Sequence, residues 1–319
     1  MTVKTTDTYD LRKRAILVKV NTSVLGTQKK DQEATAKAAL DHNANKDQIF
    51  VGKNIVNRKN PLFKKLDKIR GLIRNTHLTS TGPWDDDWRV ISTKKYGSYR
   101  QVEEDLFAQA WEAVDEVIKY WEDLKAEAKI NLGDLYDESL YPSADHLRAS
   151  FSFELLTEVL PDRANTILDL DKARTDKIVA DAKALDGKRV EALTDHTHKV
   201  VREELDGMVA ALAEFGDAIP DTKRTRTFRD SLTKRMAALA DTLPGLNITG
   251  DVKLDKLAKK IAAKLATVEA SELRGDKIKG DNRTDARREA EAATKREEVA
   301  ENAKEILDDL DGVFGNPAA

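Results

Sequence analysis

The uneven distribution of aromatic residues along the 319-residue chain is the feature that most limits its fold. Of the 4 Trp, 6 Tyr and 8 Phe, all but Phe215, Phe228 and Phe314 lie in residues 1–160. Aromatic side chains bury large areas and suit a compact mixed fold, whereas Ala, Leu, Lys, Glu and Asp suit long helices packed along narrow seams. We therefore predict two domains, over residues 1–160 and 161–319, with a boundary near Pro161.

The second domain is expected to consist of helices, because its apolar residues recur every three or four positions. A first helix is expected over residues 162–216, before Pro220, and a second is expected to end at Pro244-Gly245. A third is expected from the last of the apolar stripes given below, and a charged fourth over residues 281–310. The three apolar stripes are Leu193, Thr197, Val201, Leu205, Met208, Leu212 and Phe215; Phe228, Leu232, Met236, Leu239 and Leu243; and Leu254, Leu257, Ile261, Leu265 and Val268. This pattern predicts an antiparallel helical bundle or a coiled-coil hairpin. Because the stripes are narrow, the helices need neighbours, and a homo-oligomer is expected.

The first domain is expected to be a mixed α+β fold, within a chain that is predominantly α. Short β-branched or alternating runs predict strands over residues 15–20, 88–92 and 151–155. An Ala-rich stretch predicts a helix over residues 28–40, with Thr27 as its N-cap. A further helix is expected to begin at Asn60-Pro61, because Leu62, Leu66, Ile69 and Ile73 follow at helical spacing.

A long helix is predicted from Ser98 to Leu132. Ser98 and Gln101 have the spacing of a capping box, and Gly133 stands where a helix commonly ends. Its apolar stripe consists of Val102, Leu106, Ala110, Val114, Val117, Trp121, Leu124 and Ala128. This helix is expected to be the spine of the first domain.

Composition excludes several classes of function. With no Cys, the chain cannot use disulfides, thiolate metal sites or a cysteine nucleophile. The 54 Lys+Arg and 57 Asp+Glu give a formal charge of -3, so a site for polyanions has to be a local patch. The first 14 residues lack the apolar segment of a signal peptide, and no apolar run is long enough to cross a bilayer. We expect a protein of the cytoplasm that does not associate with membranes.

The strongest local charge feature is residues 53–74, which hold eight cations against the single acid Asp67. The cations are Lys53, Arg58, Lys59, Lys64, Lys65, Lys68, Arg70 and Arg74. Lys64, Lys65 and Lys68 lie off the apolar stripe and can face a nucleic-acid backbone while the stripe packs inward. Alternatively, the nine acids of the following long helix pair with this segment inside the molecule.

Tyr96 and Tyr99 are a second candidate element of a nucleic-acid site. Lys94, Lys95 and Arg100 flank them, and rings placed among cations can stack on the bases of a single strand. The alternative is that both rings are core or capping residues before the long helix. Exposure of both rings distinguishes the two interpretations.

No motif in the chain identifies an enzyme. It contains no phosphate-binding glycine loop, dinucleotide fingerprint or nucleophile elbow. Asp85, Asp86 and Asp87 match no complete metal motif, and His196 and His198 are two apart, which is wrong for joint ligation from one helix. We expect no catalytic residues, metal or cofactor.

Several short motifs of residues 11–160 resemble, in order and spacing, the landmarks of an uncharacterised family of phage and prophage proteins. They are Thr81-Gly82-Pro83-Trp84, Asp85 to Asp87, Arg89-Val90-Ile91, Leu132-Gly133-Asp134-Leu135-Tyr136, Tyr141-Pro142-Ser143 and Phe151-Ser152-Phe153. The family favours Leu before the Pro-Trp pair and Gly before the Arg, where this chain has Gly82 and Trp88. The resemblance implies a phage accessory protein that accompanies ring-forming ATPases of the chelatase-like type, and it brings no catalytic residue.

These observations lead to one hypothesis and two alternatives. The hypothesis is a non-enzymatic phage-type binding and assembly protein whose basic segment binds single-stranded nucleic acid in phage DNA metabolism, in the bacterial host cytoplasm. The first alternative is a protein-interaction adaptor for a ring-forming ATPase, in which the basic segment is paired internally. The second is a structural component of the virion.

Overall fold

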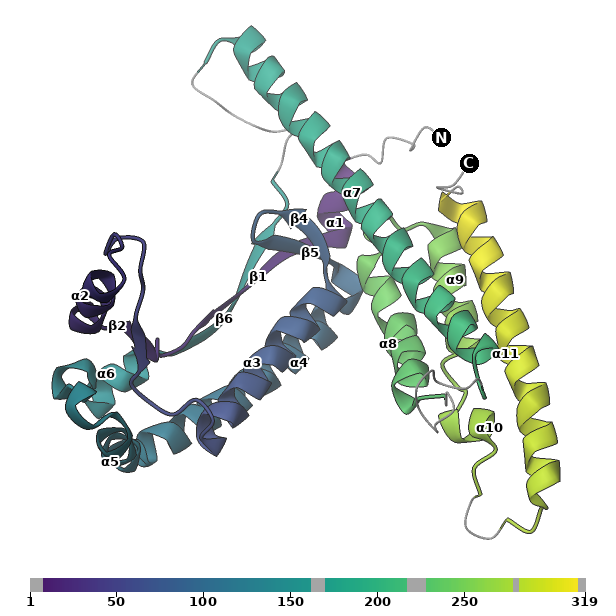
Figure 1. The fold of residues 1–319 in the computed structure, drawn as a ribbon. Helices are drawn as coiled ribbons and strands as arrows, with labels where there is room; N and C mark the ends of the chain where they lie inside the picture. The colour runs from purple at the N-terminus through teal and green to yellow at the C-terminus, as the bar shows by residue number, and fades with distance from the viewer. Residues whose placement is uncertain (1–7, 162–169, 217–227, 278–280, 315–319) are drawn as a thin grey trace. The chain divides into compact units, whose positions relative to one another are not determined.

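The computed structural model describes residues 8–161, 170–216, 228–277 and 281–314 (Figure 1). The helices are α1 (Thr8–Arg14), α2 (Gln32–Asp41), α3 (Pro61–Ser80), α4 (Thr93–Lys119), α5 (Trp121–Leu132), α6 (Ala144–Ala149), α7 (Lys172–Ala213), α8 (Asp230–Leu246), α9 (Val252–Lys264), α10 (Ala270–Arg274) and α11 (Asp285–Phe314). Two short 3₁₀ helices are η1 (Gly133–Leu135) and η2 (Glu138–Leu140). The strands are β1 (Ala15–Ser23), β2 (Gln28–Lys30), β3 (Gly52–Asn54), β4 (Gly82–Asp85), β5 (Trp88–Ser92) and β6 (Ser152–Val159). The predicted fold class is confirmed, since the structure is mostly helical, with short strands in its N-terminal part and packed helices in its C-terminal part.

The strands form two antiparallel arrangements. A four-stranded sheet has the order β4-β5-β1-β6, and β5 pairs antiparallel with both β1 and β4. A separate two-stranded sheet joins β2 to β3. The strands predicted over residues 15–20, 88–92 and 151–155 correspond to β1, β5 and β6.

Contacts divide the chain into two compact units. Unit 1 comprises Met1–Lys19, Thr79–Tyr99 and Thr157–Ala319, and unit 2 comprises Val20–Leu78 and Arg100–Leu156. The boundaries between the units fall inside β1, α3, α4 and β6. Composition led us to divide the chain at residue 160, and that division stays a prediction.

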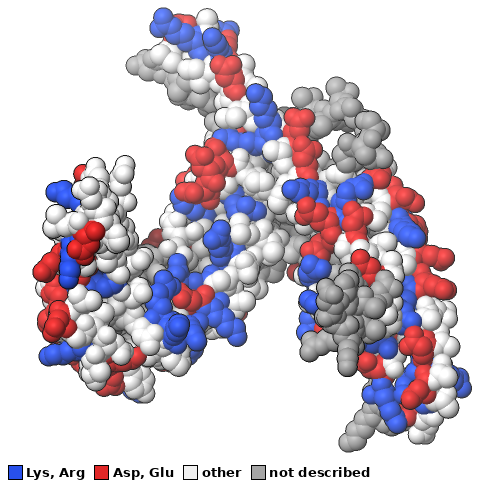
Figure 2. All heavy atoms as spheres, in the orientation of Figure 1, with Lys and Arg blue, Asp and Glu red and all other residues white. Residues whose placement is uncertain are grey.

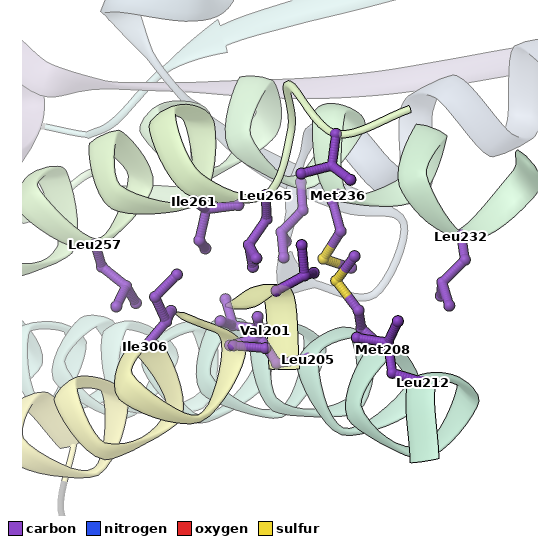
Figure 3. Close-up of a cluster of buried hydrophobic side chains, with 14 of the residues drawn as sticks. Val201, Leu205, Met208, Leu212, Leu232, Met236, Leu257, Ile261, Leu265 and Ile306 are labelled. Carbon is purple, nitrogen blue, oxygen red and sulfur yellow. The ribbon is translucent and has the colours of Figure 1, made fainter. Parts of the chain in front are cut away.

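In unit 1, the C-terminal helices pack around one apolar cluster (Figure 3). The predicted stripe residues Leu205, Met208 and Met236 belong to this cluster and are fully buried. Arg202 of α7 contacts Asp311 of α11, and the Arg296 guanidinium lies 4.2 Å from the Phe215 ring centroid, so α7 and α11 run antiparallel. The first predicted helix begins at Lys172, and its expected residues 162–169, like Pro220, lie outside the described residues.

Gly82 permits β4 to approach the helices of unit 1 closely. A Cβ at this position would overlap Cδ1 of Leu193 and would lie 3.5 Å from Cδ2 of Leu246. The indole of Trp84, two residues later, is buried, and the Arg189 guanidinium lies 5.8 Å from its centroid. This part of the motif therefore anchors β4 to α7.

In unit 2, the buried faces of α3, α4 and α5 meet in a second apolar cluster. Ile73 of α3 and Val114 of α4 are 0% exposed, and the two helices run side by side (Figure 1). The indole nitrogen of Trp121 donates to the Pro142 carbonyl at 2.9 Å, and the Tyr141 hydroxyl donates to the Ile55 carbonyl at 2.6 Å. These hydrogen bonds, of which the second is buried, tie the segment around residue 141 to the rest of unit 2.

The helix predicted over residues 28–40 is wrong at its N-terminal end. Gln28 to Lys30 form β2 and pair with Gly52 to Asn54, and the helix is the shorter α2. Its N-cap is Asp31 instead of Thr27, because the Asp31 carboxylate accepts a hydrogen bond from the Ala34 amide at 2.9 Å. A pairing between strands more than twenty residues apart overrides the local helix propensity here.

The predicted long helix also differs in its start and in its buried face. It begins at Thr93, so Ser98 is an internal residue, and an irregular residue, Tyr120, separates α4 from α5. Val102 is 47% exposed, whereas the adjacent Glu103 is 0% exposed and takes the stripe position one turn before Phe107. A smaller correction concerns α8, which continues through Pro244 to Leu246.

Candidate nucleic-acid interface

Helix α3 carries most of the basic segment and is fixed at its start by two asparagines. The Asn60 side chain accepts a hydrogen bond from the Leu62 amide at 3.0 Å, and Pro61 occupies the first helical position. The side-chain amides of Asn57 and Asn60 also donate to the two oxygens of Glu127 on α5. The sequence alone did not point to this contact, which holds the loop before α3 in place.

The buried face of α3 determines where its cations point. Leu66, Ile69 and Ile73 are buried in the cluster of unit 2. Lys64 and Lys68, one helical turn apart, lie on the opposite face and are exposed. Figure 2 shows Lys and Arg side chains gathered over α3, with a small acidic area among them.

Four of the eight predicted cations are exposed and have no partner in the part of the chain that the structure describes. The side chains of Lys59, Lys64, Lys68 and Arg74 form no hydrogen bond or ion pair with any residue that the structure describes. We call these four residues, Lys59 in the loop before α3 and the other three on the helix, the α3 cationic face. Lys64 and Arg74 are ten residues apart, or about 15 Å along the helix axis.

Three further cations are held by carboxylates of the same chain. Asp67 contacts Arg58 at 2.9 Å and Arg70 at 3.5 Å, and Glu116 of α4 contacts Lys65 at 2.7 Å. These pairs are partly exposed, so each contributes little to stability. Of the nine acids of the predicted long helix, Glu116 alone is ion-paired with the basic segment in the described part of the chain.

The eighth cation, Lys53, has a structural role. Its side chain is 13% exposed, its ammonium donates to the Leu135 carbonyl at 2.6 Å, and it lies 3.5 Å from Asp31. The pKa of Asp31 is lowered, chiefly by its hydrogen bond from the Ala34 amide and further by Lys53. Lys53 therefore joins η1 to the start of α2 and is not available to a ligand.

The two tyrosine rings are not both exposed, as stacking on bases would require. Tyr99 is 4% exposed, so its ring cannot stack on a base, and the Tyr96 hydroxyl lies 3.1 Å from Oγ1 of Thr157. Both belong to unit 1, whereas residues 53–74 belong to unit 2. The interpretation of Tyr99 as a core residue is the one that its burial supports.

Two of the three acidic candidates are paired with cations of the same chain. Asp85 is paired with Arg189, and Asp87 lies 2.9 Å from Lys19. Burial lowers the pKa of both His196 and His198. Across the described ranges, no group of three or more His, Asp or Glu side chains is placed to hold a metal ion.

Neither a membrane-spanning helix nor a similar protein adds to the evidence from these side chains, within the residues that the structure describes. Among the helices that the structure describes, none has both the length and the apolar character needed to cross a bilayer. Comparison with protein-family models, curated proteins and solved structures gives no match for this chain.

Proposed function

We propose that the protein is a non-enzymatic, phage-type binding and assembly protein that engages single-stranded nucleic acid through the α3 cationic face. The observation that supports this most directly is the arrangement of α3. One of its faces is buried in apolar contacts, and the opposite face carries exposed cations that have no carboxylate partner among the described residues. Cations in this state are available to neutralise phosphates and release condensed counterions.

A single strand is the proposed ligand because α3 also exposes an apolar side chain beside its cations. Leu72 is 44% exposed and follows Lys68 by one turn. A base that is not stacked within a duplex can cover such a side chain while its phosphate contacts a lysine. Two side-chain types with complementary roles thus lie on one face.

Reversing the charge of Lys64 and Lys68 is expected to weaken binding of a labelled single strand about 10- to 100-fold at 50 mM salt, since each lost phosphate contact removes roughly tenfold. Fluorescence anisotropy with K64E/K68E measures the loss. A matched control is K37E/K46E, because Lys37 and Lys46 are exposed residues of unit 2 and the change in net charge is the same.

The control variant should bind within about threefold of the wild type, because diffuse attraction at this salt is screened beyond roughly 14 Å. Equal losses in the two variants would show that net charge, and not α3, governs binding. Equal affinity for a duplex of the same length would remove the preference for single strands.

The alternative function is a protein-interaction adaptor for a ring-forming ATPase. It is supported by the large apolar side chains of unit 2 that are at least half exposed among the described residues, namely Leu40 at 82%, Phe50 at 58%, Ile130 at 83% and Leu135 at 50%. A complex with such an ATPase that withstands K64E/K68E but is lost in Ile130→Asp would favour this function. The expected homo-oligomer, the cytoplasmic location and a role in the virion stay predictions, and absence from purified particles would dismiss the last.

A further inference from the structure

Asp67 is placed to control how many cations the basic segment can offer. It is the single acid of residues 53–74, and its two oxygens contact two different arginines. Oδ2 lies 2.9 Å from Nη2 of Arg58, and Oδ1 lies 3.5 Å from Nη1 of Arg70. The Arg58 side chain is 55% exposed and that of Arg70 is 32% exposed, so both guanidinium groups border solvent.

We infer that Asp67 is an internal competitor for nucleic-acid phosphate, a regulatory role that rests on the proposed function and deepens it. Carboxylate and phosphate oxygens accept hydrogen bonds from the same N–H groups of arginine. Asp67 accepts a hydrogen bond from Nη2 of Arg58 and lies 3.5 Å from Nη1 of Arg70, so its charge offsets the two guanidinium groups that a phosphate would contact. The negative charge of its carboxylate also repels a phosphate that approaches Lys64 or Lys68.

The ion pairs of Asp67 are close but partly exposed, so a phosphate can replace the carboxylate without unfolding the helix. Arg70 and Asp67 are three residues apart on α3, so the carboxylate stays within reach of this arginine whenever the helix is folded. The pairs are partly exposed and hence individually weak, so their loss leaves the fold intact. The buried Nε of Arg70 also has no hydrogen-bond partner among the described residues, so its guanidinium is incompletely satisfied.

Asp67→Asn is the variant that tests this role. It keeps the size of the side chain and removes the charge, so Arg58 and Arg70 become available beside the α3 cationic face. We expect several-fold tighter binding of a labelled single-stranded oligonucleotide at 50 mM salt. The plot of log Kobs against log salt should steepen by about 1.4, the value for two added single-strand phosphate contacts.

A cycle of variants separates this role from a general effect of charge. R58A/R70A in the wild-type background should bind more weakly than the wild type, because the Asp67 carboxylate then lies beside Lys64 and Lys68 without its two cations. D67N/R58A/R70A should lose most of the gain seen in D67N. Asp123→Asn is the matched control, since Asp123 is an exposed acid of unit 2 without an ion pair in the described part of the chain.

The outcomes distinguish the two proposals. If the wild type binds through Lys64 and Lys68 but D67N binds with the same affinity and salt slope, the competitor role is overturned and the proposed function stands. The competitor role also fails if the gain in D67N persists without Arg58 and Arg70, or if D123N gives the same gain. If neither the wild type nor D67N binds at 20 mM salt, both proposals fail.

Discussion

Replacing Glu103 with leucine is expected to stabilise the protein at pH 7 by roughly 1–3 kcal/mol, the usual penalty of a buried polar group without a partner. Glu103 is 0% exposed, and neither of its carboxyl oxygens has a hydrogen-bond partner within the described ranges. It lies on the buried face of α4, one turn before Phe107 and two turns before Ala110. Leucine fills a similar volume without a polar atom, and denaturant unfolding measures the gain.

The same residue should make stability depend on pH. Burial raises the pKa of Glu103 to about 8, whereas the value in an unfolded chain is near 4.5. The folded state therefore retains a proton that the unfolded chain has released, and stability falls as pH rises from about 4.5 to about 8. The slope is at most about 1.4 kcal/mol per pH unit.

Glu103→Gln is the control that isolates this titration. It keeps the polar atoms but cannot ionise, so its advantage over the wild type should grow between pH 5 and pH 8. His196 and His198, whose pKa values are lowered by burial, remove stability as pH falls, but they do so equally in both proteins. A constant difference between wild type and E103Q across this range would contradict the assignment.

Trp121→Ala should be the most damaging single substitution in unit 2, with an expected loss of about 3–5 kcal/mol in the free energy of unfolding. Trp121 is 2% exposed, and its ring centroid lies 6.1 Å from that of Tyr141. The substitution creates a cavity and leaves the Pro142 carbonyl without the indole donor.

The neighbouring Tyr120→Ala is a matched control for Trp121, because Tyr120 is also aromatic but 42% exposed. It should cost less than about 1 kcal/mol, since a surface substitution away from packed features has a small effect. Similar losses for the two variants in urea unfolding would mean that Trp121 does not hold α5 to the segment around Tyr141.

Hydrophobic spacing and residue type along the sequence predict those helices and strands whose structure depends mainly on neighbouring residues. The apolar spacing after Asn60-Pro61 predicted α3, and the β-branched runs predicted β1 and β5. Residues 28–30 were assigned to a helix because their strand forms only with a partner at Gly52 to Asn54. Hydrophobicity predicts that Val102 lies on the buried face of α4 and that Glu103 lies on the surface. The structure has the reverse, because tertiary packing can bury a charged residue.

The candidate site was predictable as a charge segment but not as a set of available cations. The spacing of Asp67 and Arg70 indicates a helical ion pair, whereas the contact between Asp67 and Arg58 depends on the path of the loop before α3. Likewise, the burial of Tyr99 and the engagement of Lys53 by Leu135 and Asp31 follow from residues distant in sequence. The sequence gives the net charge of the segment, whereas the fold determines which of its charged side chains are available to a ligand.

The most direct measurement of the central claim is the salt dependence of single-strand binding by the full chain. With four available cations, log Kobs should fall with log salt at a slope of about -3, and the slope should be about -1.5 when Lys64 and Lys68 are replaced by alanine. The absence of binding at 20 mM salt, or an unchanged slope in the K64A/K68A variant, would contradict the claim that the α3 cationic face binds nucleic acid.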